Sequence, residues 1–197
     1  MARDRDDILN EPYPRLPLTP PEGWSLDNFP TNDVPTRTEL IRGVLVDNPL
    51  PYWHSKAVEM LRRLIDEQCP PEYLAERSTA IRKSSRAAPE PDISIVHANA
   101  FDLDLDRTFY MPEHVVSTAE VLTPESEERD REDKPAIYAA MGIPTFWLVE
   151  RAEDGSLIVH ERRLIDGGVY RLIKTHAGRL TTDVPFPIDI PLTVRTR

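Results

Sequence analysis

Proline is distributed unevenly along this chain, and its distribution limits where regular structure can form. Many of the 20 prolines lie within the first 35 residues, most densely in EPYPRLPLTPPEGW. Proline interrupts helix interiors and central strands. We therefore predict that residues 1–35 form an extended arm, partly disordered or draped over the domain or a partner subunit. Regular structure is expected in residues 36–197, the second predicted domain.

Beyond the arm, hydrophobic patterning predicts a hairpin, a helix and several strands. RTELIRGVLVDNP is typical of two short strands that turn at Arg42-Gly43. PYWHSKAVEMLRRLIDEQCP has apolar residues at three- and four-residue spacing, which predicts an amphipathic helix ended by Pro70-Pro71. Four further segments predict strands, and the last two are expected to be buried: YLAERSTAIR, PDISIVH, HVVSTAEVL and IPTFWLVE. The acidic stretch FDLDLDRTFYMPEH is expected to be a loop or an insertion.

A second helix and a second hairpin complete the pattern. TPESEERDREDKPAIYAAMG predicts a loop that opens into a helix with Gly142 as its C-cap. SLIVHERRL and GVYRLIKTH flank Asp166, Gly167 and Gly168, which predicts a hairpin. DVPFPIDIPLTV is expected to be an edge strand or a wrap-around tail. Together these elements predict an α/β (α+β) fold with a mixed sheet flanked by helices and added β-hairpins.

Charge, cysteine content and hydropathy exclude several classes of protein. The net charge of -10 argues against a strong general DNA binder, because lysine and arginine supply most non-specific phosphate affinity. A nuclease remains compatible, since its metal ligands are acidic and its basic groups can be local. The single cysteine, Cys69, is expected to pack at a helix end and suits a reducing cytoplasm. No apolar run approaches the ~18–20 residues of a membrane span, and no secretory signal is recognisable. We therefore expect a cytoplasmic protein without a membrane partner.

Two carboxylates stand out because they lie in otherwise apolar strands. Asp92 begins one strand after Pro91, and Glu120 lies near the end of another. A carboxylate in such a position is costly unless it is paired or metal-bound. If the two strands are neighbours, both side chains can converge on a hard cation such as magnesium. The alternative is structural: Asp92 caps a turn and Glu120 pairs with an arginine.

The same segments resemble a known family. EPDISIV and VVSTAEVLTPESEERDREDKPAIYAAMGIPTFWLVE are similar to the bacterial Uma-two family of restriction endonucleases, and so are the opening hairpin with its helix, GVYRLI and PFPIDI. The resemblance covers roughly residues 37–190. It implies the restriction-endonuclease-like PD-(D/E)XK nuclease fold, with DNA as the substrate and Mg²⁺ as the cofactor, for which Mn²⁺ can substitute.

The resemblance also implies roles for individual residues. Asp92 and Glu120 would be metal ligands and, with Lys134, catalytic residues. The superfold's lysine is expected two residues after the glutamate, where this chain has Leu122, so the family resemblance assigns that role to Lys134. Burial would lower the pKa of this lysine and nearby carboxylates would raise it. The alternative for Lys134 is a solvated residue at the start of the helix.

Further residues are second-tier candidates. Glu39 matches a glutamate of the family's opening hairpin, and His54 matches a histidine of its first helix, although a lone helical histidine is more often structural. Tyr138 shares a helix face with Lys134 and is expected to pack first, with a hydrogen bond to the site as an alternative. Trp147 is expected in the core, or at most at a dimer contact.

Three functions are compatible with these residues. The first is a metal-dependent endonuclease that hydrolyses DNA phosphodiester bonds. The second is a catalytically silent metal- or nucleic-acid-binding member of the fold that acts as an interaction module. The third, a glycosidase with two carboxylates ~5–10 Å apart, needs an aromatic-lined groove, which an aromatic content of 7% supports poorly. A homodimer is expected, because duplex-cleaving enzymes of this superfold often pair two sites.

Overall fold

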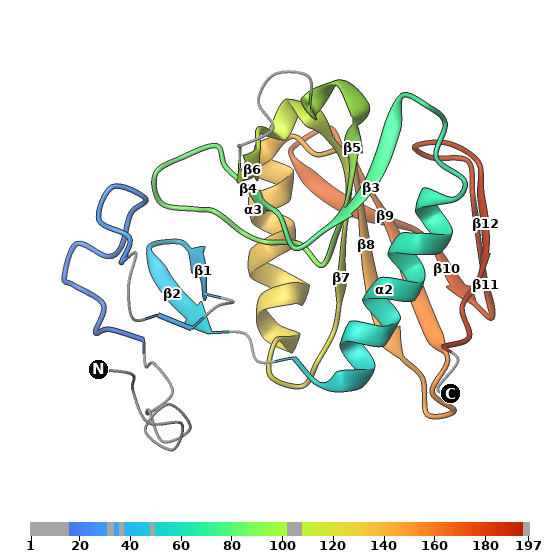
Figure 1. Cartoon of the computed structure of the whole chain (residues 1–197), viewed down its shortest axis with the longest axis horizontal. Helices are drawn as coiled ribbons and strands as arrows, with labels where there is room; N and C mark the ends of the chain where they lie inside the picture. The colour runs from blue at the N-terminus through green and yellow to red at the C-terminus, as the bar shows by residue number, and fades with distance from the viewer. Residues whose placement is uncertain (1–15, 31–33, 36–37, 48–49, 102–107, 195–197) are drawn as a thin grey trace, which may run out of the picture.

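A six-stranded mixed sheet forms the centre of the protein, for which a computed structural model describes residues 16–30, 34–35, 38–47, 50–101 and 108–194 (Figure 1). The strand order is β10-β9-β8-β7-β5-β3. Only β7 and β8 pair in parallel, and every other neighbouring pair of this sheet is antiparallel. Its strands are β3 (Tyr73–Arg77), β5 (Ile93–His97), β7 (Val115–Val121), β8 (Thr145–Arg151), β9 (Leu157–Ile165) and β10 (Val169–Ala177).

The parallel pair at the centre requires a crossover, because two parallel strands cannot be joined by a tight turn. The crossover from β7 to β8 contains a π-helical turn, Arg129–Asp133, followed by helix α3 (Lys134–Met141). Pro135 has no N–H with which to continue the α-helical ladder into the preceding turn, which fits the wider turn at this point. Helix α3 ends where Gly142 adopts φ 84°, and the predicted C-cap is confirmed.

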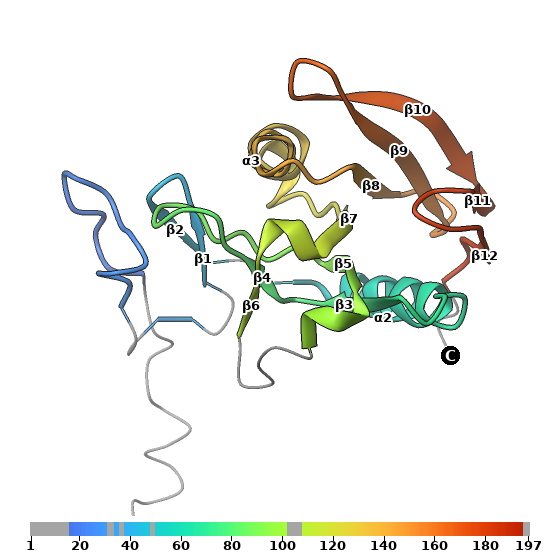
Figure 2. The same ribbon diagram turned by 90° about the horizontal axis from the view of Figure 1, so that it is seen from above.

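Helix α2 (Tyr52–Asp66) covers the opposite face of the sheet, as Figure 2 shows. Its buried residues Ala57, Val58, Leu61 and Ile65 pack in one cluster with apolar residues of the central strands. A small two-stranded sheet of β11 (Arg179–Thr182) and β12 (Ile188–Pro191) extends the same cluster. The predicted amphipathic helix is thus confirmed, but it ends at Asp66, before Pro70-Pro71.

The opening hairpin lies beside the sheet on the α3 side and carries part of the arm. It is formed by β1 (Thr38–Ile41) and β2 (Val44–Asp47), and Arg42 and Gly43 both have positive φ, as a tight hairpin turn requires. Trp24, Leu26 and Phe29 of the arm pack with Leu40, Leu45 and Ala88. Residues 1–15 lie outside the described residues, so the domain division after residue 35 stays a prediction.

Some short elements were not predicted. They are the single turns η1 (Ala98–Phe101) and η2 (Pro112–His114), together with β11. The predicted strand YLAERSTAIR is divided into β3 and β4 (Ala80–Ile81), and the acidic stretch expected to be a loop or an insertion contains the two-residue strand β6 (Phe109–Tyr110). Most of the acidic stretch, residues 102–107, lies outside the described residues. No helix in the described part of the chain has the length and apolar character that a membrane crossing demands.

Candidate active site

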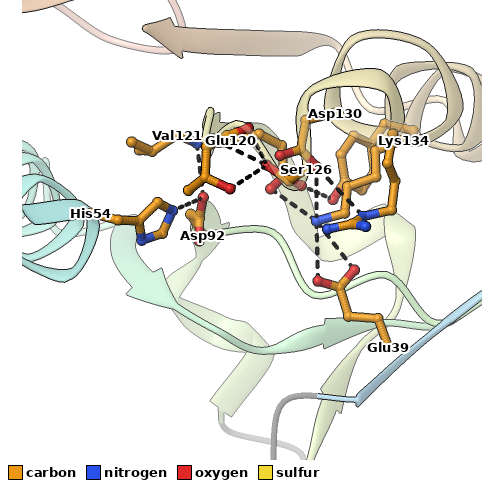
Figure 3. Close-up of polar contacts among 11 residues, drawn as sticks. Glu39, His54, Asp92, Glu120, Val121, Ser126, Asp130 and Lys134 are labelled. Atoms are coloured by element: carbon orange, nitrogen blue, oxygen red, sulfur yellow. Dashed lines mark hydrogen bonds and ion pairs between the residues drawn. The ribbon is translucent and has the colours of Figure 1, made fainter. Parts of the chain in front are cut away.

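Five residues singled out in the sequence meet in one buried region at the end of β7 (Figure 3). They come from the hairpin, both helices, strand β7 and the residue that immediately precedes β5, the strand that pairs with β7. The exposed fraction is at most 9% for each of them: Glu39, His54, Asp92, Glu120 and Lys134. Burial of so many ionisable side chains is costly unless each is paired. The contacts within the cluster show how these side chains are paired.

Lys134 lies at the centre of a group of carboxylates. Its Nζ is 3.0 Å from Glu120 Oε2, 3.2 Å from both carboxylate oxygens of Glu39, and 3.4 Å from Asp130 Oδ1. Figure 3 shows the ammonium group between Glu39 on one side and Glu120 and Asp130 on the other. The alternative of a solvated lysine at the helix start is wrong, because Lys134 is 1% exposed.

Asp92 is held at the other end of the cluster. Its Oδ2 accepts a hydrogen bond from the backbone N–H of Val121 at 2.8 Å and lies 3.0 Å from His54 Nε2. The carboxylate therefore links helix α2 to the carboxyl end of β7. The second-tier histidine thus contacts a predicted metal ligand directly, and its Nδ1 is buried and forms no hydrogen bond within the described residues.

Strand and helix periodicities explain how these side chains converge. Successive strand residues point to opposite faces, so Ala119 and Val121 face the α2 side while Glu120 faces α3. Asp130, Lys134 and Tyr138 follow one another at four-residue spacing and share one helix face. The turn that leads into this helix is fixed by Thr123, whose N–H donates to Ser126 Oγ.

Two members of the site were missed or undervalued in the sequence. Tyr138 was expected mainly to pack, but its hydroxyl donates to Glu120 Oε1 at 2.5 Å. Burial, and then the charge of Glu120, raise the pKa of Tyr138 well above 10.0, so the phenol keeps its proton and acts as a donor. Asp130 was not proposed at all. Its position four residues before Lys134 was the available signal, although the many neighbouring acidic residues obscured it.

The electrostatics of the cluster fix the charge of the lysine. Burial lowers the pKa of Lys134, but the carboxylates, Glu120 foremost, outweigh burial and hold the pKa well above 10.5. Burial raises the pKa of Glu120 well above 4.5; Lys134 opposes this rise, and Asp130, Asp92 and Glu39 add to it. Two basic side chains face these carboxylates, Lys134 and Arg129, whose Nε lies 3.9 Å from Asp130 Oδ1. Carboxylates from Glu39, Asp92, Glu120 and Asp130 thus outnumber the basic side chains of the region.

This excess fits a divalent cation. No three His, Cys, Asp or Glu side chains of the described residues converge closely enough to hold a metal by themselves. Magnesium, however, is commonly held by one or two carboxylates together with waters and substrate phosphate. Asp92, immediately before β5, and Glu120, on the adjacent strand β7, supply such a pair, and both have the hard oxygen donors that this ion prefers.

The fold and the cluster together define a class. The fold is a mixed sheet with flanking helices, and the cluster contains an aspartate, a glutamate and a nearby lysine. These are the features of a restriction-endonuclease-like α/β protein. The chain is similar to a solved structure described as "a putative nuclease" from Anabaena variabilis ATCC 29413, with a TM-score of 0.62 and 18% sequence identity. The match covers 82% of this chain and 89% of that chain. At this identity the likeness concerns the fold.

Sequence comparison identifies the family. The family model Uma2, described as "Putative restriction endonuclease", matches residues 26–195. The chain therefore belongs to the Uma-two family, and the predicted family and fold class are confirmed. A search of curated proteins gives no match.

Proposed function

We propose that this protein is a metal-dependent endonuclease that hydrolyses DNA phosphodiester bonds at the cluster around Glu120 and Lys134. The observation that carries the proposal is the excess of buried carboxylates, with Asp92 held immediately before β5 and Glu120 on the adjacent strand β7. These two residues would hold Mg²⁺ or Mn²⁺. When bound, such an ion acidifies an attacking water and neutralises charge on the scissile phosphate.

The remaining residues of the cluster position the two acidic side chains. Tyr138 donates a hydrogen bond to Glu120 and so fixes one of its oxygens. His54 and the Val121 N–H fix Oδ2 of Asp92. Because its pKa is raised, Lys134 keeps its proton and acts as a hydrogen-bonding cation toward the phosphate rather than as a general base.

The catalytically silent alternative has its own support. Lys134 is already engaged by the carboxylates, and Leu122 stands where the superfold's lysine is expected. The net charge of -10 also disfavours strong binding of intact DNA. In that case the protein would bind metal or nucleic acid as an interaction module without cleavage. A glycosidase is disfavoured by membership in an endonuclease family.

Cleavage of supercoiled plasmid and of single-stranded DNA with Mg²⁺ or Mn²⁺ tests the proposal. Wild type is expected to cut, and Asp92→Asn, which preserves shape but removes the charge, is expected to lose activity by at least 100-fold, on the order of the loss seen when a metal site is weakened. Asp154→Asn is the matched control, because Asp154 is fully exposed in the turn between β8 and β9.

The outcomes of this experiment distinguish an endonuclease from an interaction module. Metal binding by wild type, measured by calorimetry, with no cutting of either DNA would support the interaction module. Cutting by Asp92→Asn at the wild-type rate would refute the proposed site.

We also propose that the protein works in the cytoplasm and forms a homodimer. The large apolar side chains exposed on β10 support self-association.

A further inference from the structure

A groove of about 340 Å³ lies at the carboxyl ends of β7 and β8. The start of α2 and the carboxyl ends of these two strands lie at the same end of the sheet (Figure 1). The groove adjoins the site along the chain, because Trp53 precedes His54 and Leu122 follows Val121. Residues that line it include Trp53, Leu122, Thr123, Arg131, Glu150 and Arg151.

Trp53 and Arg151 form an unusual pair in this groove. The Arg151 guanidinium carbon lies 5.1 Å from the centre of the Trp53 ring. Arg151 is exposed and forms no ion pair with a carboxylate of the described residues. Arg131, by contrast, is neutralised by Glu127 at 2.9 Å and by Glu150 at 2.8 Å. The groove thus contains a guanidinium that lies over an aromatic face and has no carboxylate partner among the described residues.

An aromatic face beside a guanidinium is suited to a nucleotide. Bases stack on tryptophan without regard to sequence, and arginine contacts the adjoining phosphate or stacks in turn. A volume of about 340 Å³ falls in the range of small-ligand pockets. In an intact duplex both faces of a base are covered by its neighbours, so only an unpaired or extruded base can stack on a side chain.

We propose that the groove holds an unpaired nucleobase next to the cleaved phosphate, stacked on Trp53 in place of the Arg151 guanidinium, which moves to the phosphate of that nucleotide, so that the substrate is single-stranded or locally melted DNA. This proposal rests on the proposed nuclease function. It assigns Trp53 and Arg151 to substrate binding. The acidic chain implies a low affinity for intact duplex DNA. This low affinity is then consistent with a nuclease that acts on unpaired DNA.

Binding in the absence of metal tests this assignment independently of cleavage. Anisotropy of fluorescein-labelled oligo(dT) and of a blunt hairpin duplex is measured in EDTA. Wild type is expected to prefer oligo(dT). Trp53→Leu keeps apolar bulk against the core but removes the stacking surface, and should raise the Kd for oligo(dT) by about 5- to 150-fold, whereas Trp53→Phe should retain most of the affinity. The matched control is Tyr52→Leu, an adjacent aromatic residue that is 74% exposed and does not line the groove.

Two further measurements distinguish a binding role of Trp53 and Arg151 from a merely structural one. Oligo(dT) is expected to quench tryptophan fluorescence in wild type but not in Trp53→Phe, because Trp147 is 2% exposed and Trp24 packs in the arm. Arg151→Gln should reduce the slope of log Kd against log salt by about 0.7, the value for one phosphate contact of a single strand. Arg179→Gln, at an exposed arginine paired with Asp189, is the control.

Each outcome decides one of the two proposals. Equal or tighter binding of the duplex, or an unchanged Kd in folded Trp53→Leu, would overturn the groove assignment while Asp92-dependent cleavage could still establish the nuclease. Loss of oligo(dT) affinity and of quenching without any cleavage would keep the groove assignment and refute the enzymatic function. Unfolding curves of Trp53→Leu confirm that the comparison concerns folded protein, and Trp53→Phe carries the test if that variant fails to fold.

Discussion

At the scale of single residues, Lys134 determines the character of the site. It reaches Glu120 from the crossover helix, whereas the strand position two residues after Glu120 is occupied by Leu122. Its ammonium compensates carboxylates from three separate segments. Breaking a buried ion pair by removing one partner leaves uncompensated charge in a region of low polarity, which is strongly destabilising.

Lys134→Met should therefore lower the free energy of unfolding by about 3–5 kcal/mol at pH 8. The loss should shrink at pH 5, where the stranded carboxylates can take up protons. Urea unfolding in EDTA measures both values. Lys174→Met, at an exposed lysine of β10 whose Nζ contacts a backbone carbonyl, should leave stability within about 0.5 kcal/mol of wild type. Equal stability of the two variants would contradict the buried ion network.

The raised pKa of Glu120 predicts a second pH dependence of the free energy of unfolding, which arises from this carboxylate. Its pKa in the folded protein lies well above the 4.5 of the unfolded chain, so the folded state binds more protons between these two values. Wild-type stability should consequently fall as pH rises from about 4.5 through the folded pKa. Glu120→Gln removes this slope, and it should be more stable than wild type at pH 8 in EDTA. A pH profile parallel to that of wild type would contradict the raised pKa.

At the scale of elements, the crossover depends on a sharp end to α3. Gly142 has φ 84° and its N–H and that of Ile143 cap the last turn through Ala139 and Tyr138 carbonyls. A Cβ added at Gly142 would meet no atom within 4 Å. The cost of a side chain there is therefore conformational strain alone, without steric conflict with the rest of the protein.

Gly142→Ala should lower the free energy of unfolding by about 1 kcal/mol. Gly142→Asn should cost less, because asparagine tolerates the left-handed conformation better than alanine. Thermal unfolding of the two variants beside wild type provides the comparison. The reverse order would show that the helix end relaxes into another conformation.

Elements with a clear periodicity could be predicted from the sequence, and elements defined by pairing could not. The amphipathic face of α2 and the buried run of β7 are local patterns. By contrast, the division of the predicted strand YLAERSTAIR into β3 and β4 and the pairing of β4 with β6 depend on tertiary contacts, and β11 follows β10 after Gly178 with no separate signal. Likewise, strand alternation places Glu120 on one face, but only tertiary packing brings Glu39 to Lys134.

At the scale of the whole molecule, three of the six large apolar side chains exposed in the described residues lie on one edge strand of the sheet. Strand β10 ends the six-stranded sheet and exposes Val169, Leu172 and Ile173, with a bulge between Leu172 and Lys174. Large apolar patches on a protein surface commonly mark interaction sites. The bulge and the lysine disfavour continuous strand pairing at this edge, so the apolar side chains rather than the backbone would form the contact.

Sedimentation velocity at micromolar concentration should therefore detect a dimer. Leu172→Ser should shift the distribution toward monomer, because it removes an apolar group from the centre of the exposed set. Leu18→Ser provides the control, since Leu18 is 94% exposed but lies in the arm. A monomeric wild type would refute self-association, and an unchanged dimer in Leu172→Ser would place the interface elsewhere.

The wide separation of the site residues along the chain has a consequence for biosynthesis. Lys134 is 95 residues from Glu39 and 14 from Glu120, and His54 is 38 from Asp92. A chain growing from its N-terminus on the ribosome contains His54 and Asp92 before α3, but it presents both ends of the Lys134 contacts only after α3 has emerged. Because distant segments must close large loops before their contacts stabilise anything, the acidic cluster has no counterpart in shorter nascent chains. A truncated product of translation would therefore carry the acidic ligands without the lysine that organises them.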